Sequence, residues 1–352
     1  MCDATRPLTL VTGAPGWLGS RLVESLVRGL PDVPGLAAPP GSEVRCLVRR
    51  DTDAAGLRAL PGVTAVPGDL ADVASLRRFV RRASGATLFH CAGVIHPRRT
   101  SAFEVVNAAG TRALLDVAAE AGVRRFIHVS SNSPFGANSS PEQRFTEGAP
   151  YHPYMGYGRS KMAAEQAVWR VHAAGKLETV IVRAPWFYGP GQPPRQTQFF
   201  TMIRTGRFPL VGDGTNRRSM AYIDNLCQGL LLAEQRPEAR GRAFWVADER
   251  PYSMNEILET VENVMERDFG IAVTRKRLRL PVLAADAARL ADRVLQAVGL
   301  YDQRIHVLSE MPLTIACATD AAQRELGYRP TVALEEGMRR SLHWLLSQGI
   351  VV

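Results

Sequence analysis

The stretch LTLVTGAPGWLG, residues Leu8–Gly19, decides the fold of this chain. Leu8–Thr12 is a short β-rich run, and Gly13, Gly16 and Gly19 follow it with the spacing Gly-x-x-Gly-x-x-Gly before a helical pattern begins. Glycines so placed let backbone N–H groups approach a pyrophosphate at a helix N-terminus, where the helix dipole favours negative charge. A plain tight turn is the weaker interpretation, because a strand precedes the glycines and a helix follows them. The residues predicted to bind a dinucleotide here are Thr12, Gly13, Gly16, Trp17, Leu18 and Gly19.

The first half of the chain repeats this alternation of strand and helix. Strand-like runs lie at 8–12, 44–48, 63–66, 87–91, 126–130 and 179–183, and helical patterns lie between them, for example at 18–28, 76–82, 103–121 and 157–174. Alternation of this kind predicts a doubly wound parallel sheet with helices on both faces.

The regular alternation of predicted strands and helices ends at about residue 185. A Gly/Pro-rich loop at 189–194 precedes helical patterns near 198–205, 225–235, 254–266 and 281–298, with short strands near 219–223 and 243–247. We therefore predict a dinucleotide-binding domain over residues 1–185 and a smaller α+β substrate lobe over residues 186–352. A late segment, 314–318, is a candidate to return to the main sheet.

Composition narrows the functional classes. The net charge of +9 comes almost entirely from arginine, because only three of the 43 basic residues are lysine, and the arginines are spread along the chain rather than gathered in a basic tail. This spread argues against nucleic-acid binding. The five cysteines are odd in number, widely separated and without metal-binding spacing, which favours a reducing cytoplasm and no metal site. No apolar stretch of about 18 residues occurs, so we expect no membrane span.

One of the three lysines, Lys161, follows Tyr157 by four residues. On a helix these two side chains point the same way, one turn apart. A phenol ordinarily ionises near a pKa of about 10, and a neighbouring ammonium would lower that pKa and suit the phenol to general acid–base work. An amphipathic helix with a snorkelling lysine is the structural alternative.

The end of the second predicted strand bears on the choice of dinucleotide. It ends in Arg49 and Arg50, and an acid appears only at Asp51. Arginine accommodates a ribose 2′-phosphate, whereas a carboxylate accepts hydrogen bonds from the 2′-hydroxyl. We therefore favour NADP over NAD, with solvated strand-end arginines as the alternative interpretation.

Further motifs occur in a consistent order along nearly the whole chain. They include Gly68-Asp69-Leu70, His90-Cys91-Ala92-Gly93, Asn107 with Gly110-Thr111, Val129–Gly136, Arg183–Gly191, Gly212–Arg218, Tyr222–Asn225 and Leu326–Pro330. Together with the glycine loop and Tyr157/Lys161, they resemble the extended short-chain dehydrogenase/reductase family. Epimerases, dehydratases and hydroxysteroid-dehydrogenase-like enzymes belong to that family, and the resemblance implies a Rossmann-type fold.

The resemblance also implies roles for individual residues. Counting back five from Gly136 gives Ser131 as the catalytic hydroxyl, with Tyr157 passing a proton to or from the substrate oxygen. Lys161 would hold the cofactor ribose and lower the pKa of Tyr157. Other residues implied to line the cofactor are Arg49, Arg50, Asp69, Leu70, Cys91, Ala92, Gly93 and Ala184. The helices over 103–121 and 157–174 commonly pair across a two-fold axis in this family, which implies a homodimer.

The substrate is less constrained, and two reactions stay open. The candidate substrate residues are Asn132, Ser133, Trp186, Phe187 and Arg218. Trp186 stands where nucleotide-sugar members place an Asn, which favours a NADP(H)-dependent oxidoreductase that interconverts a ketone and a secondary alcohol on a small, partly apolar molecule. Arg218 stands where sugar-nucleotide members bind a diphosphate, which favours a 4-epimerase with tightly held NAD(P). A third class, a cofactor-sensing protein without catalysis, is disfavoured by the intact Ser131, Tyr157 and Lys161.

Overall fold

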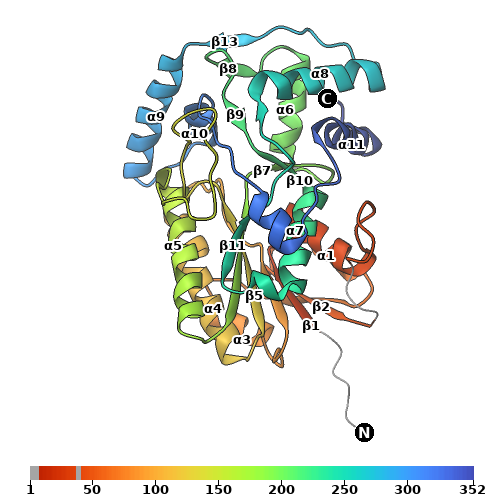
Figure 1. Ribbon diagram of the computed structural model, residues 1–352, viewed down its shortest axis with the longest axis vertical. Helices are drawn as coiled ribbons and strands as arrows, with labels where there is room; N and C mark the ends of the chain where they lie inside the picture. The colour runs from red at the N-terminus through yellow and green to blue at the C-terminus, as the bar shows by residue number, and fades with distance from the viewer. Residues whose placement is uncertain (1–7, 37–40) are drawn as a thin grey trace.

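The structure, a computed structural model, describes residues 8–36 and 41–352 and is built on one seven-stranded parallel sheet (Figure 1). Its spatial order is β11-β6-β5-β4-β1-β2-β3, and each neighbouring pair runs parallel. Its strands are β1 (Leu8–Thr12), β2 (Glu43–Val48), β3 (Val63–Pro67), β4 (Thr87–His90), β5 (Arg125–Ser131), β6 (Glu178–Ala184) and β11 (Arg242–Trp245). The predicted doubly wound α/β fold is confirmed.

Helices cover both faces of this sheet, because their apolar sides pack against the buried side chains of the strands. On one face α3 (Val73–Phe79), α4 (Gly110–Glu120) and α5 (Met155–Ala173) pack on the sheet, and α1 (Trp17–Arg28) and α7 (Ile223–Gln235) pack on the other (Figure 1). The central strand β4 is buried along its whole length, as expected for a strand that is covered on both sides. The remaining first-half elements are α2 (Ala55–Arg58) and the π-helix η1 (Phe103–Ala109), which leads into α4.

The second part of the chain forms a smaller group of helices and two-stranded sheets beyond the carboxyl ends of the main strands (Figure 1). Its strands are β7 (Trp186–Tyr188), β8 (Pro209–Val211), β9 (Arg217–Arg218), β10 (Met220–Tyr222), β12 (Tyr252–Ser253) and β13 (Leu278–Leu280). Its helices are α6 (Pro194–Arg204), η2 (Pro237–Ala239), α8 (Met254–Phe269), α9 (Val282–Ala297), α10 (Gln303–Glu310), η3 (Ala322–Leu326) and α11 (Leu334–Ser347).

The seventh strand of the main sheet corrects one expectation from the sequence. The segment 314–318 does not return to this sheet: it forms isolated bridges, Ile315 to Arg218 and Cys317 to Phe145. The strand that does return is β11, which pairs with β6 from Val180 to Arg183. The intervening helix α7 provides the long crossover that a parallel neighbour needs.

In the described part of the chain, no helix combines the length and the apolar character needed to cross a bilayer.

Candidate active site

The glycine loop lies directly against the end of β4. Gly13 has a φ of +90°, and a Cβ on it would come within 2.6 Å of the backbone nitrogen of Ala92 and the backbone carbon of Cys91. A Cβ on Gly19 would come within 2.5 Å of the backbone of Gly13. Only glycine fits such close backbone approaches. The loop therefore forms the open backbone cradle at the start of α1 that a pyrophosphate requires.

Two aromatic residues join the glycine loop to the loop after β7. The indole of Trp17 donates to the backbone carbonyl of Pro190 over 2.7 Å, and its ring lies 4.8 Å from that of Phe187. Trp186 packs edge-to-face on Phe199 of α6 at 5.4 Å. These contacts hold the loop after β7 over the start of α1. Leu18, by contrast, is buried in the core.

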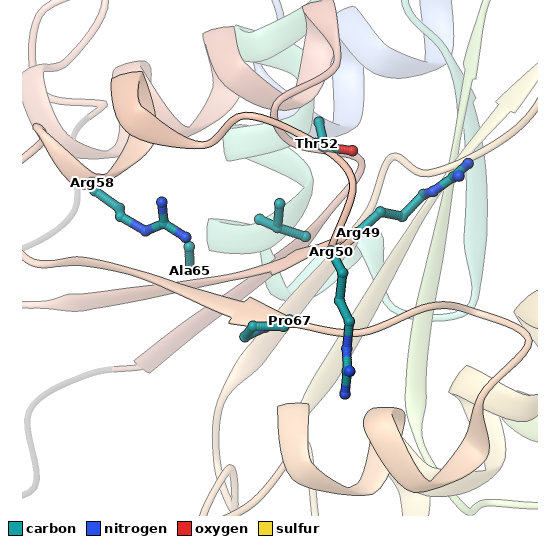
Figure 2. Close-up of a pocket in the computed structure, with 7 residues that line it drawn as sticks. Arg49, Arg50, Thr52, Arg58, Ala65 and Pro67 are labelled. Atoms are coloured by element: carbon teal, nitrogen blue, oxygen red, sulfur yellow. The ribbon is translucent and has the colours of Figure 1, made fainter.

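A pocket of about 350 Å³ lies beside the end of β2. Figure 2 shows Arg49 and Arg50 leaving the strand in different directions, and Arg58 lying over Ala65. Arg49 is engaged by both carboxylate oxygens of Asp51, at 2.7 and 3.1 Å, and its Nε lies 4.0 Å from Asp69. In the described part of the chain, the side chains of Arg50 and Arg58 have no hydrogen-bond or ion-pair partner, so their guanidinium groups are available to an anion.

The other residues implied for the cofactor lie near the carboxyl ends of neighbouring strands. The backbone nitrogen of Cys91 donates to the carbonyl of Thr12 over 3.2 Å, and the nitrogen of Ala92 donates to the Thr12 hydroxyl over 3.3 Å. The Asp69 carboxylate accepts from Ala71, Leu70 is buried, and Gly93 approaches the Asn107 amide. Ala184 pairs with Ser131 in the register of β5 and β6. The fold thus brings these residues to one edge of the sheet.

Helix α5, which carries the candidate catalytic residues Tyr157 and Lys161, is fixed by buried polar contacts. Asn107 exchanges two hydrogen bonds with the backbone of Val94, at 2.8 and 2.9 Å, and donates to Ser160 over 3.0 Å. One turn further on, Glu165 is fully buried and accepts from Arg183 of β6 over 2.8 Å. Breaking a buried pair of this kind leaves an uncompensated charge, which is strongly destabilising. These contacts therefore fix α5, with Tyr157 and Lys161, against η1 and β6.

Lys161 lies beneath the site with its ammonium turned toward β5. Its Nζ donates to the carbonyl of Val129 over 2.7 Å and lies 3.3 Å from Nε2 of His128. Burial lowers the pKa of His128 well below its usual value, so this imidazole is neutral and can accept from the ammonium. An ammonium carries three donors, so one remains for a ligand above the strand.

The charge of Lys161 should make cofactor affinity depend on pH. Burial lowers the pKa of Lys161 to about 8, against the opposing effect of the Glu165 carboxylate. The ammonium is present below that pH and lost above it, so we expect NADPH affinity, measured by fluorescence titration, to fall as pH rises through about 8. Lys161→Met should weaken binding and remove this dependence, whereas Lys276→Met, at an exposed position before β13, should retain it. An unchanged pH profile in Lys161→Met would contradict the role of this lysine.

Tyr157 is brought to Ser131, as predicted, but its ionisation differs from the expectation. Burial raises the pKa of Tyr157 to about 12, and the neighbouring Ser131 hydroxyl opposes that rise. The Lys161 ammonium is directed to Val129 and His128. The charged groups that act on the phenol are Glu310, which raises its pKa, and Arg195, which lowers it. The phenol therefore stays protonated at neutral pH in the protein alone.

The neighbours of Ser131 form a small hydroxyl cluster. Its Oγ lies 3.4 Å from Oγ of Ser133, accepts from the Ser133 backbone nitrogen over 3.3 Å, and lies 3.5 Å from the Asn132 amide oxygen. Asn132 and Ser133 thus surround the predicted catalytic hydroxyl. Arg218 lies apart from this cluster, on β9, where its guanidinium donates to the backbone carbonyl of Glu310.

The structure adds residues that local sequence patterns did not identify. Phe103 lies between Tyr157 and Tyr301, with ring-centre distances of 5.9 and 5.6 Å, and the Tyr301 hydroxyl is 2.7 Å from Nδ1 of His96. Arg58 joins the arginine pocket from α2. No spacing rule links Tyr301 or Arg58 to the motifs, because only the fold brings them near. Within the described residues, no group of three or more His, Cys, Asp or Glu side chains could hold a metal ion.

Comparison with known proteins gives consistent matches over most of the chain. A sequence model described as the NAD dependent epimerase/dehydratase family matches residues 9–247. The uncharacterized protein y4nL of Sinorhizobium fredii is 52% identical over 344 residues, which cover 97% of this chain and 96% of that protein. The 4-hydroxy-2-methyl-3-oxo-4-farnesyl-3,4-dihydroquinoline-1-oxide ketoreductase of Stigmatella aurantiaca is 29% identical over 337 residues, with 94% of each chain covered.

Solved structures agree with this match. DesIV, a dTDP-glucose 4,6-dehydratase from Streptomyces venezuelae with NAD and TYD bound, has a TM-score of 0.73 and 27% sequence identity, with 97% of each chain covered. The similar proteins thus include a ketoreductase and a sugar dehydratase.

Proposed function

The chain belongs to the NAD-dependent epimerase/dehydratase family and is an NAD(P)-dependent enzyme, and we propose that it is a NADP(H)-dependent oxidoreductase that interconverts a ketone and a secondary alcohol. The observation that carries this proposal is the protonated phenol of Tyr157 beside the hydroxyl of Ser131. A phenol in that state can give a proton to a carbonyl oxygen as the carbonyl is reduced. The half-buried ring of Tyr301, which packs on Phe103 next to Tyr157, favours a substrate that is small and partly apolar.

The mechanism follows from the positions of these side chains. Ser131 donates a hydrogen bond to the substrate oxygen, and Tyr157 passes its proton to that oxygen or takes it back in the oxidative direction. The ammonium of Lys161, held by the Val129 carbonyl and the His128 imidazole, places a positive charge below these two side chains. Gly13, Gly16 and Gly19 form the cradle that fits a pyrophosphate. When bound, the nicotinamide cofactor supplies or accepts the hydride.

The residues beside Ser131 support ketone–alcohol chemistry over dehydration. Loss of water next to a carbonyl needs one group to take a carbon-bound proton and another to protonate the departing hydroxyl. The two side chains that follow Ser131 are the amide of Asn132 and the hydroxyl of Ser133, and neither ionises near neutral pH. The similarity to the Stigmatella aurantiaca ketoreductase supports the same choice.

The arginine pocket supports NADP as the preferred cofactor. Arg50 and Arg58 line it, and no described residue neutralises either guanidinium. Arg49 contributes less charge than its place in the sequence suggested, because Asp51 engages it. A 2′-phosphate in this pocket would gain charge-assisted hydrogen bonds from the two unengaged arginines.

The double variant Arg50→Gln/Arg58→Gln should weaken NADPH binding without weakening NADH binding. Each hydrogen bond to a charged group contributes about 1.5–3 kcal/mol, so we expect a loss of at least about tenfold in NADPH affinity. Calorimetric titration with both cofactors measures the ratio, and Arg77→Gln, which removes an exposed arginine paired with Glu120, is the control. Equal losses for NADPH and NADH would refute a 2′-phosphate site.

A nucleotide-sugar 4-epimerase is the second candidate, and Arg218 is the observation that favours it. Its guanidinium is half-buried and donates to the carbonyl of Glu310, its only hydrogen bond within the described residues. Arginine has five donors, so this residue could also bind a diphosphate. An epimerase would interconvert nucleotide sugars without net consumption of cofactor, whereas the proposed reductase consumes NADPH with a ketone.

A further inference from the structure

Two fully buried histidines lie side by side in the main sheet, next to Lys161. His90 ends β4 and His128 lies on β5, and the two residues are cross-strand neighbours. Their ring centres are 5.3 Å apart, and neither side chain has exposed surface. A buried imidazole loses its hydrogen bonds to water, so protein groups have to replace them. The partners of the two rings therefore indicate what each ring does.

The partners of His90 fix its tautomer and its position. Thr111 donates its hydroxyl proton to the carbonyl of Asn107 over 2.6 Å, so it can only accept from Nε2 of His90, which is 2.9 Å away. Burial lowers the pKa of His90 to about 3, so the ring is neutral and its Nδ1 is an acceptor. This nitrogen accepts from the Thr12 hydroxyl over 2.7 Å. Both nitrogens of His90 are thus bonded, and its ring is a fixed support for the ring beside it.

His128 is bonded differently, because one of its nitrogens faces Lys161. Its Nε2 lies 3.3 Å from Nζ of Lys161 and has to accept, since an ammonium only donates. Burial holds the pKa of His128 well below its usual value, so the ring is neutral and its proton is on Nδ1. Within the described residues, Nδ1 is buried and has no hydrogen-bond partner. The tautomer that suits Lys161 thus leaves a buried donor unbonded, which distinguishes this ring from a histidine that only fills the core.

The ammonium of Lys161 depends on few acceptors. Its side chain is buried, and in the described part of the chain it donates to the carbonyl of Val129 over 2.7 Å and to His128. The titratable groups that face it from the elements packed around it are Glu165, Cys91, His90 and His128. Without the imidazole of His128, the Val129 carbonyl would be the one hydrogen-bond acceptor left to it among described residues. The ammonium would then be less stable and less firmly directed.

We propose that His128 is a positioning residue, whose Nε2 lone pair holds the Lys161 ammonium so that its remaining N–H is directed to the bound cofactor. This inference rests on the proposed role of Lys161 in cofactor binding. His128 acts through the lysine and needs no contact with the substrate. His90 supports the ring of His128 and bonds to Thr12, which also accepts from the backbone nitrogen of Ala92 over 3.3 Å. The two histidines thereby join the lysine to the start of the glycine loop.

Two amide substitutions separate this role from a structural one. The amide oxygen of His128→Gln can reach the position of Nε2 and accept from Lys161, whereas the shorter side chain of His128→Asn reaches only the position of Nδ1. Both variants keep a polar side chain in the core. Fluorescence titration of NADPH across pH gives the midpoint at which affinity is lost as Lys161 deprotonates.

We expect His128→Asn to lower this midpoint, because an ammonium without its acceptor loses its proton at a lower pH. The shift should be at least about one pH unit, the size expected for the loss of one hydrogen bond to a charged group. His128→Gln should retain the wild-type midpoint. His172→Asn is the matched control, because His172 accepts from the backbone nitrogen of Thr179 over 3.3 Å in the last turn of α5, and it should leave the midpoint unchanged.

A double-variant comparison completes the test. At a pH of about 8, His128→Asn should lower NADPH affinity in the otherwise wild-type protein and cause no further loss in Lys161→Met, because the histidine acts through the lysine. An unchanged midpoint in His128→Asn, an equally low midpoint in His128→Gln, or an equal loss with and without Lys161 would overturn the positioning role alone. A wild-type affinity that does not depend on pH would overturn the role of Lys161 as well. NADPH consumption with ketones reports the proposed reaction separately, and melting temperatures monitor folding.

Discussion

Replacing Tyr157 by phenylalanine is expected to lower kcat by about 10²–10⁴-fold, the usual contribution of a positioned general acid or base. The change removes only the hydroxyl that carries the transferred proton, and the ring keeps its contact with Phe103. The glycine cradle and the arginine pocket are untouched, so the affinity for NADPH should stay within a factor of about two. Steady-state kinetics together with a fluorescence titration of NADPH separates the two effects.

Tyr328→Phe is the matched control for this change. It also removes one buried tyrosine hydroxyl, which donates to the carbonyl of Ala247 over 2.7 Å, away from the site. Loss of that hydrogen bond should cost about 1 kcal/mol of unfolding free energy, with turnover retained. Near-normal turnover in Tyr157→Phe would show that this phenol does not transfer the proton.

Gly13→Ala should have the second large effect, through the loss of cofactor binding. The new Cβ would lie 2.6 Å from the backbone of Ala92 and Cys91, which cannot move without displacing the end of β4. The φ of +90° adds backbone strain on the order of 1–3 kcal/mol for a residue with a side chain. We expect NADPH affinity to fall by at least about 100-fold, measured by calorimetry, with a lowered melting temperature.

Gly85→Ala separates the effect of backbone strain from the effect of the steric clash that Gly13→Ala creates. Gly85 has a φ of +77°, and a Cβ on it would meet nothing within 4 Å. It should therefore lose some stability and keep its NADPH affinity. If Gly13→Ala binds NADPH as tightly as Gly85→Ala does, the loop is not the pyrophosphate cradle.

Much of the fold could be predicted because its signals are local. The alternation of short apolar runs and helical patterns fixed six strands of the main sheet, and the glycine spacing located the loop between β1 and α1. The seventh strand was misassigned for a physical reason. β11 is only four residues long and begins with an exposed arginine, so its sequence does not show that it pairs with β6.

The sequence could propose candidate catalytic residues, but it could not predict the electrostatics of the candidate site. Ser131, Tyr157 and Lys161 follow from motif spacing, and the fold brings them to one end of β5 and α5. The raised pKa of Tyr157 comes from burial, and the Lys161 ammonium is directed to the carbonyl of Val129; neither can be read from a four-residue spacing. The availability of Arg50 and Arg58 likewise depends on which arginine Asp51 engages.

The most direct test of the central claim is the stoichiometry of NADPH oxidation by the wild-type protein, measured with a panel of cyclic and aromatic ketones and with nucleotide sugars. The account predicts that one NADPH is consumed for each secondary alcohol formed from a ketone, and that Tyr157→Phe abolishes this consumption. Interconversion of nucleotide sugars without net change in cofactor, and no oxidation of NADPH with any ketone, would contradict it.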